Sequence, residues 1–334
     1  MEEIKIFVPG RLCLFGEHSD WASNYETVEK GYAIVCGLNQ GVNIKSKKSK
    51  EFIIIQNGNI RKLEKLDIIA KSDDFLAYIA GTIKYINDYI ISEGIEIEIL
   101  ESTLPIKKGL SSSAAICVAV AKAYNELYNL NLDNKEIMEI AYQGERNTKS
   151  QCGRMDQICA YGKSLNLITF KDEKIDITPI KPKFNIYLVF ADLEKSKDTI
   201  KILKDLNDCF PNPKNEIEKN VHLGLGILNE NIILEVIHEI ENGNIKELGN
   251  LMTKAQNIFD NYVAKASSEL EAPYLHELLN DEEVKRLSLG GKGVGSQGDG
   301  SIQFIVENEE KQDMLCEYLK SKNLKPYKIL IEGE

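Results

Sequence analysis

PIKKGLSSSAA, residues Pro105–Ala115, places one glycine and three consecutive serines between a predicted strand and a predicted helix. Ile95–Leu100 alternates Glu with Ile and Leu, as strands do, whereas Ala114–Tyr128 is rich in Ala, Val and Leu and predicts a helix. The serines therefore fall at a helix N-terminus, where unpaired N–H groups and the helix dipole favour an anion. We interpret the segment as a phosphate-binding loop. The alternative is simple N-capping by Ser111 or Ser112, which needs only one serine.

Three further segments accompany this loop along the chain. They are PGRLCLFGEHSDW (Pro9–Trp21), QCGRMDQ (Gln151–Gln157) and GGKGVGSQGDG (Gly290–Gly300). Together and in this order, the four segments resemble the motifs of the GHMP kinases, the family of galactokinase, homoserine kinase, mevalonate kinase and phosphomevalonate kinase. The resemblance spans nearly the whole chain, and within the family the first motif is most similar to that of galactokinase, PGRxNxIGEHxDY.

The resemblance implies a fold and a division of the chain. It implies an α+β, two-domain GHMP kinase fold, with an N-terminal ribosomal S5 domain 2-like part and a C-terminal ferredoxin-like α/β sandwich. After a predicted strand at Asn185–Asp192 the composition shifts to long helical stretches, beginning with Lys195–Asn207, Asn215–Asn229 and Asn244–Phe259. We therefore expect an ATP-binding domain over residues 1–190 and a second domain over 191–334.

Composition limits the function further. The 334 residues are 43% hydrophobic and 28% charged, which is ordinary for a globular protein with substantial cores. Forty-one basic against fifty-two acidic residues give a net charge of −11, which argues against a nucleic-acid binder. No apolar run reaches the length of a membrane span and MEEIKIF is not a signal peptide, so we expect a cytoplasmic protein. The seven cysteines form no CxxC pair and are expected to be reduced.

The first motif carries the predicted substrate site. Ile4–Val8 predicts a strand that ends at a Pro9-Gly10 turn, followed by a bend rich in polar groups. Taken alone, such a bend is more often simply solvated. The resemblance to the family implies that Arg11 lies beside the transferred phosphoryl group. It also implies that Glu17, His18 and Asp20 hydrogen-bond the sugar.

Asp20 favours a sugar over mevalonate, because mevalonate kinases usually lack an acid at this position and have lysine in place of Arg11. The stretch ASNYETVEKG that follows Trp21 is longer than the corresponding galactokinase linker. The particular sugar is therefore not determined by the motif.

The phosphate loop and the middle motif carry the predicted nucleotide, metal and catalytic residues. The resemblance implies that Asp156 is the catalytic carboxylate beside the acceptor hydroxyl, together with Arg11. It also implies that Glu145 ligates Mg²⁺ with Ser112 or Ser113; the less favoured alternative is that Glu145 is an exposed helix residue. The expected nucleotide-binding set is Lys108, Gly109, Leu110, Ser111, Ser112, Ser113 and Ala114. Lys107 occupies a position that is typically glycine in the family, and its role is open.

The C-terminal glycine-rich segment contains GVGSQG, which matches the dinucleotide pattern GxGxxG. It is followed by SIQFIV, a predicted strand, whereas the dinucleotide site requires a helix, so this reading fails. In the GHMP kinases a segment of this kind closes over the substrate and phosphates. Gln297 and Asp299 depart from the usual run of glycines, and their roles are open.

The sequence therefore predicts a kinase that uses ATP and Mg²⁺ to phosphorylate a small molecule. The leading substrate is a galactose-like sugar or uronic acid, phosphorylated at its anomeric hydroxyl to give a sugar 1-phosphate. A mevalonate-type kinase and a non-catalytic regulator that binds sugar and ATP are the alternatives. We expect a monomer or homodimer, with no nucleic-acid or membrane partner.

Overall fold

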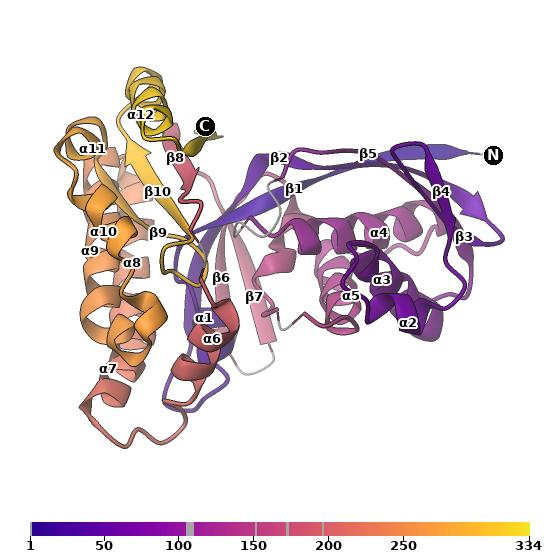
Figure 1. Ribbon diagram of the computed structural model, residues 1–334, viewed down its shortest axis with the longest axis horizontal. Coiled ribbons are helices and arrows are strands. Elements are labelled where there is room, and N and C mark those ends of the chain that lie inside the picture. Colours follow the sequence, from indigo (N-terminus) through magenta and orange to yellow (C-terminus); the bar gives the residue numbers. More distant parts are fainter. Residues whose placement is uncertain (1, 105–109, 151, 172–173, 196) are drawn as a thin grey trace. The chain divides into compact units, whose positions relative to one another are not determined.

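The computed structural model divides the chain into two compact units, each made of two segments (Figure 1). The structure describes residues 2–104, 110–150, 152–171, 174–195 and 197–334. The first unit comprises Met1–Arg11 and Gly37–Lys163, and the second comprises Leu12–Cys36 and Ser164–Glu334. The bounds of the expected domains, 1–190 and 191–334, differ from those of these two units, and the expected domains remain a prediction.

The first unit is built on a mixed sheet. β3 pairs antiparallel with β4 and parallel with β5, β5 pairs antiparallel with the second part of β2, and β1 also pairs with β2. The strands are β1 (Glu3–Phe15), β2 (Gly31–Ser49), β3 (Phe52–Gln56), β4 (Asn59–Lys62) and β5 (Gly94–Ser102). The predicted strand at Ile95–Leu100 is confirmed, as part of β5.

One local expectation for this sheet is wrong, because Pro9 and Gly10 do not end a strand but lie inside β1. A side chain on Gly10 would come within 2.4 Å of Leu104 Cδ2 and 2.7 Å of the Leu110 carbonyl oxygen. The glycine is therefore required for close approach and not for a turn.

The helices of the first unit lie along one face of these strands (Figure 1). They are α2 (Leu66–Ala70), α3 (Leu76–Tyr89), α4 (Ser112–Tyr128), α5 (Asn134–Arg146) and the 3-10 helix η1 (Asp156–Tyr161). α4 is the predicted helix after the serines, and its alanine-rich stretch is buried. α5 begins with a capping box, in which Asp133 and Glu136 each accept a backbone N–H from the other.

The second unit contains an antiparallel sheet in the order β11-β8-β10-β9, with helices that follow one another along the chain. Its strands are β8 (Ile186–Asp192), β9 (Gly290–Gly293), β10 (Ser301–Val306) and β11 (Lys325–Ile331). The predicted strand SIQFIV is β10, so the dinucleotide-fold reading is excluded by structure as well. β6 (Leu165–Lys171) pairs with β7 (Lys174–Ile180) and with the first part of β2.

The helices of the second unit are shorter than expected. They are α1 (Ser19–Ala22), α6 (Thr199–Asn207), α7 (Glu216–Leu225), α8 (Ile227–Asn242), α9 (Ile245–Ile258), α10 (Pro273–Asn280), α11 (Glu282–Leu287) and α12 (Glu309–Ser321), with a π-turn at Phe259–Val263 and 3-10 turns at Ala264–Ala266 and Ser268–Leu270. The stretch expected to be one helix over Asn215–Asn229 is broken at Gly226, where α7 ends and α8 begins. None of the helices in the described ranges is long and apolar enough to cross a bilayer.

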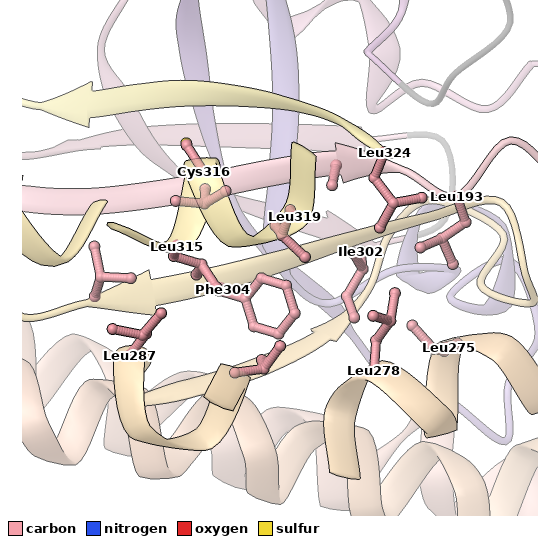
Figure 2. Packing of buried hydrophobic residues seen from close by; sticks show 14 of the residues in the cluster. Leu193, Leu275, Leu278, Leu287, Ile302, Phe304, Leu315, Cys316, Leu319 and Leu324 are labelled. Atoms are coloured by element: carbon pink, nitrogen blue, oxygen red, sulfur yellow. The ribbon is translucent and has the colours of Figure 1, made fainter. Parts of the chain in front are cut away.

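Apolar side chains from one face of the four-stranded sheet form a core with the C-terminal helices. Figure 2 shows Ile302 and Phe304 of β10 gathered with Leu315 and Leu319 of α12 and with residues of α10 and α11. The Gln312 side chain, buried in this layer, donates to the carbonyls of Leu188 and Ile329 at 2.7 and 2.9 Å. All seven cysteines are free, as expected, and only Cys152 is not fully buried.

The close packing of α3 against α5 gives a test of the first unit. A Cβ on Gly144 would lie 2.5 Å from Thr82 Oγ1 and 2.6 Å from Thr82 Cα. Because a backbone atom must move, we expect Gly144→Ala to lower the free energy of unfolding by ~1–3 kcal/mol. Urea unfolding measures the loss, with Asn134→Ala, an exposed change in the same helix, as the control. Equal midpoints for the two variants would contradict the packing argument.

Candidate active site

The serine loop is described from Leu110 onward, so Lys107, Lys108 and Gly109 lie outside the described residues. Ser111 is the N-cap of α4 and has a left-handed backbone, with φ of 55°. Its hydroxyl makes no capping hydrogen bond and has no partner among the described residues, although it is buried. Simple capping by Ser111 therefore does not account for the loop. A buried hydroxyl at a helix N-terminus fits an anion that the structure does not contain.

Glu145, near the end of α5, is 1% exposed, so its expected alternative as a surface residue is wrong. Ser150 Oγ donates to Glu145 Oε1 at 3.1 Å and Gln157 Nε2 to Oε2 at 2.9 Å. Burial, and secondly the charge of Asp156, raise the pKa of Glu145 to about 7, while the hydroxyl of Ser113 and the two other donors lower it. The predicted approach of Glu145 to Ser113 is therefore present.

These oxygen atoms suit a magnesium ion. Among the described residues no cluster of three or more His, Cys, Asp or Glu side chains could hold a metal by itself. Mg²⁺ is usually held by one or two protein oxygens together with substrate phosphates and water. Among the described residues the buried Glu145 carboxylate has no cationic partner and lies next to a serine hydroxyl at the phosphate loop, which fits that pattern.

Arg11 and Asp156 form the centre of the first unit's site. Arg11 Nε donates to Asp156 Oδ1 at 3.1 Å, and a second guanidinium nitrogen bonds the same oxygen. The side chains are 8% and 26% exposed, so the arginine is buried and the carboxylate is open to solvent. The Arg11 backbone N–H donates to the Leu110 carbonyl at 3.2 Å, which ties the arginine to the serine loop. The structure therefore brings together Arg11, Asp156, Glu145 and the described part of the loop.

The first motif continues in the second unit, where Gly16 makes the bend. Gly16 has φ of 94°, and a Cβ there would meet the Tyr32 carbonyl oxygen at 2.1 Å, so only glycine fits. Glu17 forms a buried ion pair with Lys292, whose side chain is 3% exposed. Asp20 lies in the first turn of α1. The substrate residues predicted from the first motif, Glu17, His18 and Asp20, thus all belong to this unit.

His18 is held between two aromatic rings. Trp21 Nε1 donates to His18 Nδ1 at 3.1 Å, and the imidazole stacks on Phe259 with ring centres 6.0 Å apart. Burial, followed by the charge of Lys197, lowers the pKa of His18 to about 4, while the Ser296 carbonyl acts in the opposite direction. The imidazole is therefore neutral near pH 7.

The glycine-rich segment supplies the remaining groups of this unit. Asp299 accepts the Leu275 and Tyr274 N–H groups at 2.7 and 3.4 Å, so its role is to bind the first turn of α10. Gln297 is 2% exposed and, with Glu17 and Lys292, lines a cavity of about 40 Å³. Asp299 therefore has a structural role, whereas Gln297 is a cavity-lining residue whose side-chain oxygen has no hydrogen-bond partner among the described residues.

Sequence analysis did not single out Lys197 or Lys292. Lys292 lies between glycines in β9, and Lys197 follows the end of β8; both look like solvated lysines in the sequence. The one available signal was Lys292 itself, a lysine inside a strand that is otherwise glycine. Gln157 and Ser150, which hydrogen-bond Glu145, were also missed.

Comparison with known proteins agrees with this arrangement. Residues 77–163, which include the serine loop, α5 and Asp156, match the GHMP kinases N terminal domain. This part of the chain therefore resembles the N-terminal domain of the GHMP kinases. Curated relatives are galactokinases: that of Pasteurella multocida is 23% identical, over 92% of this chain and 86% of the relative, and that of Thermosipho africanus is 26% identical, over 92% and 93%.

Solved structures show the same GHMP kinase fold. The galactokinase of Lactococcus lactis, complexed with galactose, superposes with a TM-score of 0.74 at 18% identity, over 99% of this chain and 94% of that one. The mevalonate kinase of Methanococcus jannaschii gives 0.74 at 24% identity, over 100% and 99%. At these identities the likeness establishes the fold, and the expected α+β architecture is confirmed. By sequence the chain is galactokinase-like, and the solved structures that share its fold include a galactokinase and a mevalonate kinase.

The raised pKa of Glu145 predicts a pH dependence of stability. Because the folded-state pKa is about 7 against an ordinary 4.5, the folded protein binds this proton more tightly than the unfolded chain does. The contribution of Glu145 to stability is therefore greatest below pH ~4.5, is lost as the pH rises to ~7 and is constant above that, a change of ~1–3 kcal/mol.

Urea unfolding of the metal-free protein, compared with Glu145→Gln at each pH, isolates this effect. Between pH ~4.5 and ~7, the free energy of unfolding of the wild type should fall relative to that of Glu145→Gln. Glu126→Gln, an exposed glutamate of α4, is the matched control and should give a constant difference. A constant difference for Glu145→Gln as well would contradict the assignment.

Proposed function

We propose that this GHMP kinase transfers the γ-phosphoryl group of ATP to a hydroxyl of a monosaccharide, at the anomeric position. The observation that carries the proposal is the Arg11–Asp156 pair, held beside the serine loop and Glu145 in one compact unit. ATP is the phosphoryl donor expected of the family, and Mg²⁺ is the proposed metal, with Glu145 and Ser112 or Ser113 as its protein ligands.

In the proposed reaction the acceptor hydroxyl oxygen forms a bond to the γ-phosphorus as the bond to the β–γ bridging oxygen breaks, which releases ADP. The hydroxyl proton passes to, or is oriented by, Asp156, the more exposed member of the pair. Arg11 neutralises charge on the transferred group, as phosphoryl transfer depends on alignment and charge. Bound Mg²⁺ would supply further neutralisation of phosphate charge.

The phosphate-binding residues proposed here are Leu110 and the serines, with Ala114, which is fully buried, giving a small surface at the helix start. Lys108 and Gly109 stay in the prediction as residues outside the described part of the chain. The arrangement of Arg11, Glu145 and Asp156 supports catalysis over a purely regulatory protein. A cytoplasmic location and a monomeric or dimeric state remain predictions.

A mevalonate-type kinase is the second candidate. It is favoured by the match along the whole chain to the Methanococcus jannaschii mevalonate kinase. Glu17, His18 and Asp20 favour a polyol, because neighbouring hydroxyls can satisfy several acceptors and donors at once. Measuring ADP release from ATP and Mg²⁺ with free sugars, uronic acids and mevalonate separates the candidates. ADP release with mevalonate alone would reject the sugar and retain the kinase.

The Asp156 carboxylate should be required for turnover and not for nucleotide binding. We expect Asp156→Asn to lower kcat by at least ~10²-fold, because the amide cannot accept the hydroxyl proton and no longer balances the buried Arg11 charge. Titration with a non-hydrolysable ATP analogue should give an affinity near that of wild type. Asp67→Asn, an exposed change in the same unit, is the control. Unchanged kcat in Asp156→Asn would remove this residue from the mechanism.

Asp20 should discriminate between the acceptor classes. A site built to hydrogen-bond hydroxyls rejects ligands that lack them, so a monosaccharide should bind better than mevalonate by more than ~10²-fold. Asp20→Ala should weaken sugar binding and leave ATP binding nearly unchanged, whereas Glu26→Ala, a nearby exposed carboxylate, should change neither. Calorimetric titration of both ligands into the ATP-analogue complex measures this. Equal weakening in both variants would argue against a contact from Asp20 to the sugar.

A further inference from the structure

The tautomer of His18 follows from its contact with Trp21. An indole N–H can only donate, so His18 Nδ1 must accept, and the neutral ring carries its proton on Nε2. His18 is 6% exposed, and Nε2 has no hydrogen-bond partner among the described residues. The Ser296 backbone acts on the ring and raises its pKa, but it makes no well-formed hydrogen bond with Nε2. A buried N–H donor is therefore available to a ligand.

Lys197 is a second donor in the same cluster, and its charge acts on His18. Its ammonium donates to the Gln297 carbonyl at 2.6 Å. A Cβ on Gly300 would lie 2.6 Å from both Lys197 Nζ and Cε, so the glycine makes room for this side chain. Burial lowers the pKa of Lys197 to about 8, against the opposing effect of Glu17. Lys197 is thus mostly protonated near pH 7 in a site that disfavours its charge.

The charges around these donors do not balance. Glu17 forms its ion pair with Lys292, and that pair is neutral as a whole. In the described ranges Lys197 forms no ion pair of its own, and Glu17 is the one acidic group that affects its pKa. The cluster of Glu17, His18, Lys197 and Lys292 therefore carries a surplus of one positive charge and offers N–H donors.

We propose that the acceptor carries a carboxylate, which accepts from His18 Nε2 and pairs with the Lys197 ammonium. This inference rests on the proposed kinase function and narrows its substrate to a sugar acid. A neutral hydroxyl would leave the buried lysine charge uncompensated, whereas a carboxylate accepts from both donors and neutralises it. A surplus of a single charge matches a monoanionic carboxylate better than a dianionic phosphate ester.

The test compares three acceptors at saturating ATP and Mg²⁺: galacturonate, galactose and galactose 6-phosphate. We expect wild type to favour galacturonate over galactose by at least ~10-fold in kcat/KM, the value of one charge-assisted hydrogen bond. Lys197→Met should lower kcat/KM for galacturonate by ~10–100-fold and that for galactose by less than ~3-fold. Lys197→Arg should recover part of the loss. Lys195→Met, an exposed lysine two residues earlier, is the control and should have no effect.

Failure of this inference differs from failure of the proposed function. Phosphorylation of galactose at least as efficient as that of galacturonate, with no selective loss in Lys197→Met, overturns the carboxylate and leaves the kinase standing. A preference for galactose 6-phosphate also overturns it. If no acceptor gives ADP, the proposed function fails. Calorimetric titration of galacturonate into the ATP-analogue complex then tests the carboxylate site by itself. Galacturonate binding that is lost in Lys197→Met then supports the carboxylate site, and no binding rejects it.

Discussion

The site of the first unit depends on how closely β1 approaches the segment that begins α4. Leu104 and Leu110 leave no room for a side chain at Gly10. The backbone N–H of the next residue, Arg11, donates to the Leu110 carbonyl. A buried guanidinium is thereby fixed at the serine loop before any ligand is present. Such preorganisation matters because a charge that is already in place needs no rearrangement during phosphoryl transfer.

Two buried carboxylates, one in each unit, have opposite environments. Glu17 is neutralised by Lys292, whereas Glu145 receives only neutral hydrogen-bond donors from the described residues, and the charge of Asp156 further disfavours its ionised form. A carboxylate that is paired serves to position its surroundings, and one that lacks a cation retains its full attraction for a metal. Lys197 is the cationic counterpart of Glu145, because it too is held without an opposite charge of its own in the described chain. Each unit thus keeps one charge available for a ligand.

Much of the scaffold was predictable because its signals are local. Alternation predicts β5 and β10, and the composition after the serines predicts α4, with ends within two residues of those observed. The turn predicted at Pro9-Gly10 was wrong because this dipeptide occurs both in turns and where two backbones pack closely. Only the tertiary neighbours distinguish the two cases. The helix expected over Asn215–Asn229 fails at Gly226 for the same reason, since glycine interrupts some helices and not others.

The site was predictable only in part. The Arg11–Asp156 contact joins residues 145 positions apart, which no spacing rule could pair. The family resemblance assigned both residues to the catalytic site but did not predict their contact. Lys197 and Lys292 escaped because lysine is usually exposed, and nothing local shows that glycines have made room for them. Burial is a property of the fold, so the charges that matter most for binding are the ones that a single sequence displays least.

The division of the chain also affects its synthesis on the ribosome. Both segments of the first unit have been synthesised once the ribosome has added Lys163. The Leu12–Cys36 segment has been synthesised by then as well, but it belongs to the second unit. Glu17 lies in that segment, and its partner Lys292 is 275 residues further along. During translation this carboxylate must therefore stay hydrated or find temporary partners until nearly the whole polypeptide has emerged. A fragment that ends between Lys163 and β9 would retain the phosphate loop, yet its first motif would carry an acid without its counter-ion.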